Sequence, residues 1–427
     1  MAQSWNESQL PQLIREIVAS EIDVGKGAPD DETDLVRTGL LDSMGWVAVL
    51  TGIEELSQIA NFGNPWPENR PQSIRALVAA ATETIGAGEV RTHAEGQEKI
   101  EAHRQGPVAV AGWGYTVGSL EMGAGEMEKE CGLSPGTLSS GAGIESMRRA
   151  SEQEDQVSLG QRAAEAALEG AGIEADDVDL LVTTSATFLS VPSFGAALHS
   201  RLLLSESCAV LDVGGACVGL LNALRVASSI LATGGRGVAL VVASEVHSRV
   251  LASLRAPDEF RGLFGDGASA FVLKAKQPGG QKFPTIGSFT FGCSGRPASA
   301  LEAKFTDKTD FEFQFKGEQL GRAAVERLAR IVEQLERLSG RPRSEVAAFA
   351  IHEPNPRLVE IFAQNSHVPL DKIPLVSRAY GNLGSATCGV SLCAALNALA
   401  NTPAAGRALI FVAAVGPGLL WGGTYLD

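Results

Sequence analysis

The chain has 427 residues, of which 44% are hydrophobic and 20% charged, enough for two or three domains with cores of their own. Its formal net charge of −15 argues against nucleic acid or an anionic membrane as its main partner. No apolar run is long enough to span a bilayer, and residues 1–22 are polar and interrupted by Pro11, so we expect neither a membrane span nor a signal peptide. The cysteines lack metal-binding spacing, which indicates free thiols in a reducing cytoplasm and no metal site. They are Cys131, Cys208, Cys217, Cys293, Cys388 and Cys393.

The first 86 residues form a distinct acidic module. They contain 13 Asp and Glu against 5 Lys and Arg, a net charge of −8. Apolar residues at helical spacing predict helices over 6–22 and 72–85, with another over 43–56 that Asp42 and Ser43 would cap. Residues 87–106 show no apolar periodicity and are typical of a linker. We therefore expect a small all-α bundle on a tether.

From Val108 onward, short apolar strands alternate with amphipathic helices, such as those expected over 159–171, 217–233 and 317–338. This alternation predicts a largely parallel α/β architecture. Two halves, 107–276 and 284–427, are each compatible with one strand–helix unit, a hint of duplication. The expected strands are 108–112, 178–183, 209–213, 238–243, 268–274, 285–292, 347–352 and 408–414.

Cys217 stands in the most informative segment of the chain. An apolar strand ends at Val213, Gly214 and Gly215 permit a sharp turn, and Cys217 opens an apolar helix. The positive end of a helix dipole would lower the pKa of this thiol, and the first-turn N–H groups could donate to an oxyanion. The alternative is a small buried hydrophobic residue, as most free cysteines are.

Four further motifs follow in a fixed order. Gly265-Asp266-Gly267 reads as a tight turn that shapes the site more than it reacts. His352 ends an apolar strand and precedes two prolines, and Asn382 lies in a glycine-flanked turn. A glycine-rich loop over 416–418 follows near the C-terminus.

Together these motifs resemble the β-ketoacyl-acyl carrier protein synthase III group of the thiolase superfamily, over residues 107–427. The resemblance implies an α/β thiolase-like fold of duplicated mixed-sheet halves, a homodimer, and Cys217 as the acylated nucleophile. His352 and Asn382 would polarise the second thioester and stabilise the enolate left by decarboxylation, because a neutral imidazole and a carboxamide donate without a competing charge. Pro417 has no N–H, so the N–H groups of Cys217 and Gly418 are the expected oxyanion hole.

The segment around Asp42-Ser43 resembles the attachment motif of acyl carrier proteins, with a helix, long loop and further helices around it. The resemblance implies 4′-phosphopantetheine covalently bound to Ser43 and installed by a phosphopantetheinyl transferase. The alternative is that Ser43 only caps a helix. Trp46 is unusual on the helix that partner enzymes of carrier proteins recognise. It either adjusts that recognition or packs within the module.

Three features bear on the substrate. Thr137 and Gly141 stand where bacterial relatives place a Trp and an Arg that sandwich the adenine of CoA, so we expect an acyl group delivered on a carrier. Arg357 matches a basic position at the carrier-docking mouth, the alternative being a solvated surface Arg. Val191 stands where a bulkier gate to the acyl pocket is common, which would admit a longer or branched chain.

The leading hypothesis is a cytoplasmic homodimeric enzyme that transfers an acyl group to Cys217 and condenses it, with decarboxylation, onto a malonyl-type carrier thioester in specialised polyketide or fatty-acid biosynthesis. The second hypothesis is an acyltransferase that moves the acyl group from a carrier to a hydroxyl or amine acceptor without decarboxylation. The third is a pantetheinylated, non-catalytic partner subunit. The intact Cys-His-Asn set favours the first over the third.

Overall fold

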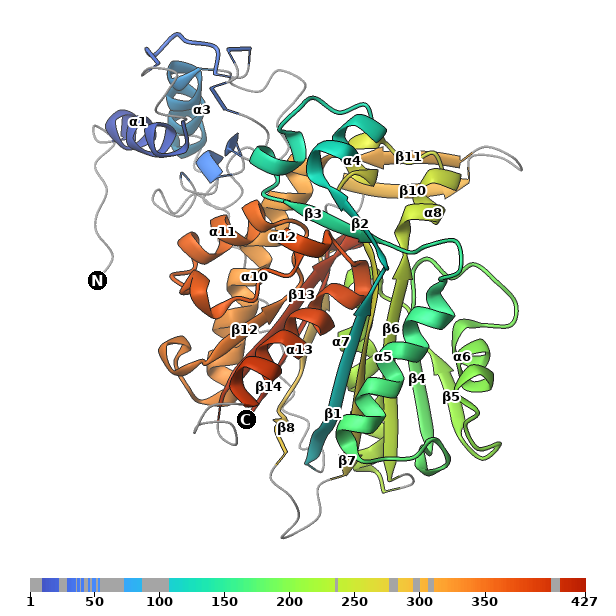
Figure 1. Cartoon of the computed structure of the whole chain (residues 1–427). Helices are drawn as coiled ribbons and strands as arrows, with labels where there is room; N and C mark the ends of the chain where they lie inside the picture. Colours follow the sequence, from blue (N-terminus) through green and yellow to red (C-terminus); the bar gives the residue numbers. More distant parts are fainter. Residues whose placement is uncertain are drawn as a thin grey trace. The chain divides into compact units, whose positions relative to one another are not determined.

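The computed structural model describes residues 10–22, 29–35, 37–38, 40–41, 45–46, 48–50, 53, 73–86, 107–234, 237–275, 283–294, 300–305, 311–400 and 408–427. The chain divides into two compact units (Figure 1). One comprises Met1–Ile100 with Gly317–Arg322, and the other comprises Glu101–Lys316 with Ala323–Asp427. Within the described residues, no helix has both the length and the apolar character needed to cross a bilayer.

The N-terminal unit contains two described helices, α1 (Leu10–Glu21) and α3 (Ile74–Gly86). Helical residues also lie at 45–46, 48–50 and 53, and the apolar side chains of all three segments share one buried cluster. Trp46 is 1% exposed, so it packs in this cluster. The helices expected over 6–22 and 72–85 are confirmed at Leu10–Glu21 and Ile74–Gly86, whereas residues 6–9, residue 72 and the linker 87–106 lie outside the described residues.

The second unit is built on one mixed sheet with the strand order β12-β13-β14-β8-β1-β7-β6-β4-β5, and β9 also pairs with β14. Two separate antiparallel strand pairs, β2–β3 and β10–β11, complete the strands described. The strands of the large sheet are β1 (Val108–Val117), β4 (Leu180–Thr184), β5 (Ala209–Asp212), β6 (Val238–Val246), β7 (Asp266–Ala275), β8 (Thr285–Ile286), β9 (Thr290–Cys293), β12 (Ala348–Ile351), β13 (Ile410–Gly416) and β14 (Leu420–Leu426). The two pairs are β2 (Leu120–Gly123) with β3 (Ser146–Arg149), and β10 (Leu301–Phe305) with β11 (Phe311–Phe315).

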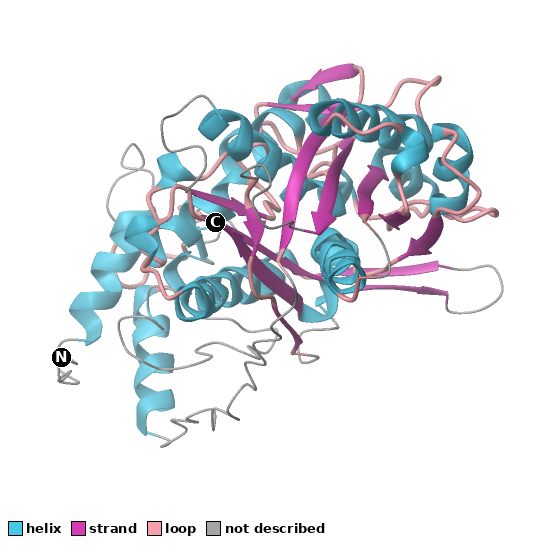
Figure 2. Ribbon diagram, turned by 90° about the horizontal axis from the view of Figure 1, so that it is seen from below, coloured by secondary structure: helices cyan, strands magenta, loops and turns pink. Residues whose placement is uncertain are grey.

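Helices lie on both faces of this sheet, as Figures 1 and 2 show. α5 and α6 share a buried cluster with β4, β6 and β7, whereas α7 and α13 belong to a larger cluster that draws on strands of both chain halves. The longer helices of this unit are α5 (Gln156–Ala171), α6 (Phe194–Leu202), α7 (Gly219–Ala232), α11 (Pro356–Asn365) and α13 (Thr387–Ala400), together with α10 (Gly317–Ser339) from Ala323 onward. Shorter ones are α4 (Ala124–Glu130), α8 (His247–Ser253), α9 (Asp258–Arg261) and α12 (Ser377–Tyr380).

The expectation of a largely parallel sheet was wrong. β4 pairs in parallel with β5 and β6, and β12 pairs in parallel with β13. However, β7 runs antiparallel to both β1 and β6, and β14 runs antiparallel to β13. A strand buried on both faces has the same apolar composition in either direction, so alternation alone did not separate the two arrangements.

Glycines in β1 explain how closely α5 approaches the sheet. A Cβ on Gly112 would lie 2.2 Å from the carbonyl oxygen of Ala167, and one on Gly114 would lie 2.5 Å from that of Ala163. Both distances are far below van der Waals contact, so a larger residue would push the helix away. The predicted helix over 159–171 is therefore confirmed, and its small residues face glycines of the strand.

Candidate active site

Cys217 lies on a sharp connection between a strand and a helix. β5 ends at Asp212, and a short 3-10 turn (Ala216–Val218) leads into α7. Gly215 has φ 140° and its Cβ would lie 2.4 Å from Nδ2 of Asn222, so only glycine fits there. Ala216 has φ 45°, a left-handed conformation that a non-glycine residue adopts at a cost. The predicted strand–turn–helix context of the thiol is confirmed.

The parallel pair β12 and β13 brings His352 to the same edge of the sheet. His352 follows the last residue of β12, and its N–H donates to the carbonyl of Ala413 in β13 at 2.8 Å. β13 ends three residues further on at Gly416, where a Cβ would lie 3.3 Å from the Cβ of Cys217. The carboxyl ends of parallel strands meet at one edge, and here that edge meets the cysteine turn.

Asn382 is held by the loop of the Gly-Asp-Gly motif. Its N–H donates to the carbonyl of Leu263 at 2.8 Å, and its carbonyl accepts from the N–H of Gly265 at 3.0 Å. A Cβ on Gly265 would lie 2.0 Å from the carbonyl oxygen of Tyr380. Asp266 accepts hydrogen bonds from residues of neighbouring elements and so fixes the turn. This motif therefore shapes the site, as expected from the sequence.

The side chain of Asn382 is oriented by two donors. Its Oδ1 accepts from the N–H of Gly384 at 2.9 Å and from the hydroxyl of Thr387 at 3.2 Å. With the amide oxygen occupied in this way, the amide nitrogen is the group left to donate to a substrate. The next short turn (Gly384–Ala386) packs against the turn that carries Cys217, so Asn382 and Cys217 lie on adjoining segments.

The ionisation of the site favours neutral groups. Burial, followed by the charge of His247, lowers the pKa of His352 to about 3, so its imidazole is neutral at physiological pH. Burial, followed by the nearby carboxylate of Glu245, raises the pKa of the Cys217 thiol to about 12. The expectation that the helix dipole lowers this pKa was wrong: the thiol is desolvated, and α7 begins only at Gly219.

The sequence analysis did not predict two residues of the site, Glu245 and His247. Glu245, at the end of β6, is fully buried and accepts from the N–H groups of Ala186 and Thr187 and from the hydroxyl of Ser385, the last at 2.5 Å. It therefore connects the loop after β4 to the turn after Asn382. An acidic residue at the end of an apolar strand was the available signal.

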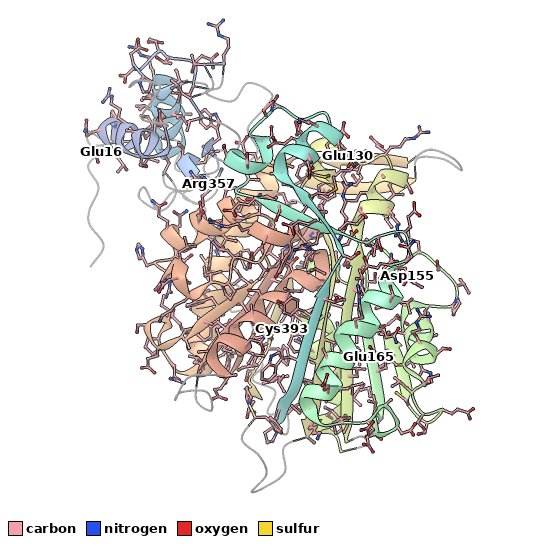
Figure 3. All side chains as sticks on the ribbon, in the orientation of Figure 1. Glu16, Glu130, Asp155, Glu165, Arg357 and Cys393 are labelled. Carbon is pink, nitrogen blue, oxygen red and sulfur yellow. The ribbon has the colours of Figure 1, made fainter. Side chains whose placement is uncertain are left out.

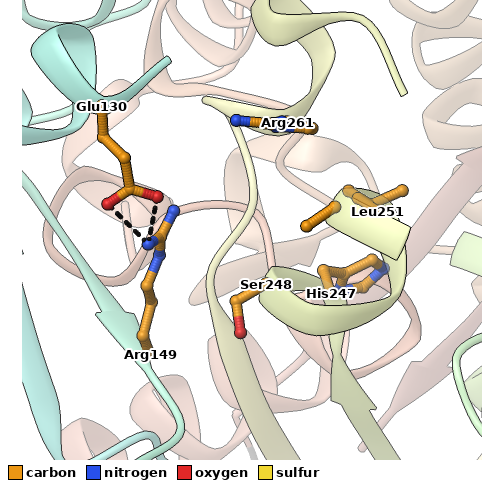
Figure 4. Close-up of a pocket in the computed structure, with 7 residues that line it drawn as sticks. Glu130, Arg149, His247, Ser248, Leu251 and Arg261 are labelled. Atoms are coloured by element: carbon orange, nitrogen blue, oxygen red, sulfur yellow. Dashed lines mark hydrogen bonds and ion pairs between the residues drawn. The ribbon is translucent and has the colours of Figure 1, made fainter. Parts of the chain in front are cut away.

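His247 is the second such residue. A Cβ on Gly384 would lie 2.3 Å from its Cε1, and its ring centroid lies 4.4 Å from that of Phe264. On another side, His247 lines a cavity of about 20 Å³, room for about one water molecule (Figure 4). Arg149 and Glu130 also line this cavity, where Arg149 points toward Glu130 and donates to both of its carboxylate oxygens. The remaining lining residues are Ser248, Leu251, Ala252 and Arg261.

The other predicted residues that the structure describes are Gly418, Val191 and Arg357. Gly418 has φ 77° in the loop after β13, and its carbonyl accepts from the thiol of Cys293 at 3.3 Å. Val191 is 98% exposed in the loop before α6. Arg357, at the start of α11 (Figure 3), forms an ion pair with Glu360 at 3.6 Å. Ser43 lies outside the described residues, as do Asp42 and Met44.

Comparison with known proteins identifies relatives of this chain. Residues 211–295 match the family model of 3-oxoacyl-[acyl-carrier-protein (ACP)] synthase III, and residues 337–427 match the model of its C-terminal part. The β-ketoacyl-[acyl-carrier-protein] synthase III of Ruegeria sp. (strain TM1040) is 31% identical over 305 residues, covering 70% of this chain and 93% of the relative.

Solved structures share the fold. The 3-oxoacyl-[acyl-carrier-protein] synthase III of Aquifex aeolicus VF5 matches with a TM-score of 0.66 at 24% identity, over 75% of this chain and 99% of the other. The priming β-ketosynthase from the R1128 polyketide biosynthetic pathway matches with a TM-score of 0.64 at 24% identity, over 75% of this chain and 96% of the other.

Proposed function

Because the chain belongs to the β-ketoacyl-[acyl-carrier-protein] synthase III family, we propose that this acyl-transferring, condensing enzyme works in two steps at Cys217, His352 and Asn382. An acyl group moves from a carrier thioester to Cys217, and a malonyl-type carrier thioester then loses CO2 and attacks the acylated cysteine. The product is a β-ketoacyl thioester for fatty-acid or specialised polyketide synthesis.

The first step needs a reactive thiol and a place for negative charge. Sγ of Cys217 attacks the thioester carbon, the carrier thiol leaves with the proton of Cys217, and the carbonyl oxygen bears negative charge in between. The N–H groups of Cys217 and Gly418 are the donors we assign to that oxygen. The high pKa of the free thiol implies that deprotonation accompanies attack and does not precede it.

The second step depends on two neutral donors. When the bond between the malonyl carbon and its carboxylate breaks, the electron pair moves onto the thioester carbonyl and forms an enolate. The neutral imidazole of His352 and the amide nitrogen of Asn382 stabilise that oxygen, and the enolate carbon then bonds to the acyl carbon while the Cys217 thiolate leaves and takes up a proton. The oriented amide of Asn382 beside the Cys217 turn is the observation that carries this proposal.

We extend the proposal to the N-terminal unit, as an acyl carrier domain with 4′-phosphopantetheine on Ser43. When bound, this group supplies a thiol that holds acyl chains as thioesters. The described residues fit such a module, because Leu41 and Trp46 are buried in the helical core on either side of the attachment segment. A tethered carrier would raise the effective concentration of its own substrate.

A homodimer is also part of the proposal. β5 is the edge strand of the sheet, and its residue Leu211 is 40% exposed. Leu189 and Val191, in the loop before α6, are 72% and 98% exposed. Apolar side chains beside an unpaired strand edge indicate a covered surface, and a gate supplied across a dimer would account for the exposure of Val191. Sedimentation at micromolar concentration tests this, since a monomer would contradict it.

The acyl donor is a carrier thioester in this proposal, docked near Arg357. Thr137 is exposed and Gly141 half-buried, and neither side chain can stack on an adenine. The wild type should therefore use acyl-CoA poorly, and the double variant Thr137→Trp/Gly141→Arg should gain acyl-CoA turnover. Efficient acyl-CoA use by the wild type would contradict this part of the proposal. A cytoplasmic location and a partner phosphopantetheinyl transferase stay predictions.

A further inference from the structure

Glu353 directly follows His352 and takes no part in the chemistry described so far. Its side chain is 0% exposed. Oε2 accepts from both the N–H and the hydroxyl of Ser377, each at 2.8 Å. Within the described residues, Oε1 has no hydrogen-bond partner. A fully buried carboxyl with one unsatisfied oxygen is costly, so its presence calls for a benefit other than stability.

Ser377 is the point at which this carboxyl reaches the segment that carries Asn382. It is the first residue of α12, a single turn that ends at Tyr380 and is followed by Gly381, directly before Asn382. Gly381 has φ 72°, and a Cβ there would lie 3.0 Å from the backbone nitrogen of Gly265. The path from Ser377 to Asn382 is thus short and tightly packed, and a shift at one end moves the other.

Among the described residues, the groups that act on this carboxyl are polar, and none of them is a cation. Ser377 faces it from α12, Val376 precedes that helix, and Ser391 and Cys388 lie on α13. Burial raises the pKa of Glu353 to about 7, although the N–H of Val376 and the hydroxyls of Ser377 and Ser391 favour the charged form. Hydrogen bonds from Ser377 therefore hold the group, and within the part of the chain that the structure describes no ion pair involves it.

We propose that Glu353 is a positioning residue for the condensation step: through Ser377 it fixes the turn that bears His352 against the segment that bears Asn382. The two donors to the enolate come from separate elements, and the hydrogen bonds of Glu353 join these elements by side-chain contact. This inference rests on the proposed function of His352 and Asn382. Cys217 lies on another element, so its acylation does not depend on this contact.

The test compares Glu353→Ala, Glu353→Gln and Ser377→Ala in the full chain. Acylation of Cys217 by an acyl-carrier thioester is followed by intact-protein mass spectrometry, and condensation by release of radiolabelled CO2 from carboxyl-labelled malonyl-carrier thioester. Both Ala variants should acylate Cys217 at the wild-type rate and lose condensation by about 100-fold, the cost of a misplacement near 1 Å. Glu353→Gln should restore condensation, because its amide oxygen can accept from both donors of Ser377.

Ser366→Ala is the matched control, since it removes a buried hydroxyl of the same size that follows α11. It should leave both rates unchanged. Unchanged condensation in Glu353→Ala and Ser377→Ala overturns the inference, and so does a loss of acylation equal to the loss of condensation. A wild-type protein that acylates Cys217 and releases no CO2 overturns the proposed function instead, so the two failures are distinguishable.

Discussion

Replacing Glu353 by Gln should change how the stability of the protein depends on pH. The pKa of Glu353 is raised from 4.5 to about 7 in the folded protein. Because the folded state binds this proton more tightly than the unfolded state, the contribution of Glu353 to stability is fully present below pH 4.5 and is lost as the pH rises through 7. At about 1.4 kcal/mol per pH unit, the loss between these two values is about 3 kcal/mol.

Gln cannot ionise, so the Glu353→Gln variant should escape this loss. Relative to the wild type, it should gain stability steadily between pH 5 and 7 and no further above pH 8. Thermal unfolding of both proteins at several pH values measures the difference, and Glu165→Gln on the exposed surface of α5 is the control. A difference between wild type and Glu353→Gln that stays constant from pH 5 to 8 would refute the reasoning, because it would mean that the carboxyl is not destabilised by burial.

Three further predictions concern the site and the carrier unit. Glu245→Gln removes a negative charge near Cys217 and should lower the pKa of the thiol, so iodoacetamide should alkylate Cys217 faster at pH 8 than in the wild type; an unchanged rate would contradict the electrostatic contact. Gly384→Ala places a Cβ 2.3 Å from Cε1 of His247 and forces the alanine into a φ of 58°, so condensation should fall at least tenfold while Cys217 acylation is retained. Full condensation activity in this variant would contradict the packing of Gly384 against His247. A phosphopantetheinyl transferase with CoA should add a phosphopantetheine-sized mass to the Ser43 peptide, and Ser43→Ala should abolish the addition; a modified Ser43→Ala protein would place the attachment elsewhere.

Local patterns in the sequence were enough to predict the elements that carry the site. Cys217 was expected after a strand and glycine turn, His352 at a strand end and Asn382 in a glycine-flanked turn, and the structure has each of them there. Each of these placements depends on residues that are neighbours in sequence, such as Gly215, whose backbone conformation in the turn before Cys217 requires glycine. The order of the motifs indicated the family, and the comparisons then showed that the chain belongs to it.

Contacts between distant segments could not be predicted in this way. Glu245 meets the loop after β4 and the turn after Asn382, and Glu353 meets Ser377, and no local periodicity encodes either pairing. β14 was missed because Gly422 and Gly423 interrupt its apolar pattern. A Cβ at either position would lie 2.6 Å from a neighbouring side chain, so these glycines are what close packing demands.

Intact mass spectrometry combined with CO2 release tests the central claim most directly. The full chain would be mixed with acyl-carrier thioesters of several chain lengths, first alone and then with malonyl-carrier thioester. We predict an acyl adduct on Cys217 that accumulates in the first reaction and disappears in the second, with one CO2 released for each β-ketoacyl thioester formed. Loss of the adduct to a hydroxyl or amine acceptor without CO2 release would contradict condensation and favour acyl transfer, and no adduct on Cys217 at all would contradict the assigned nucleophile.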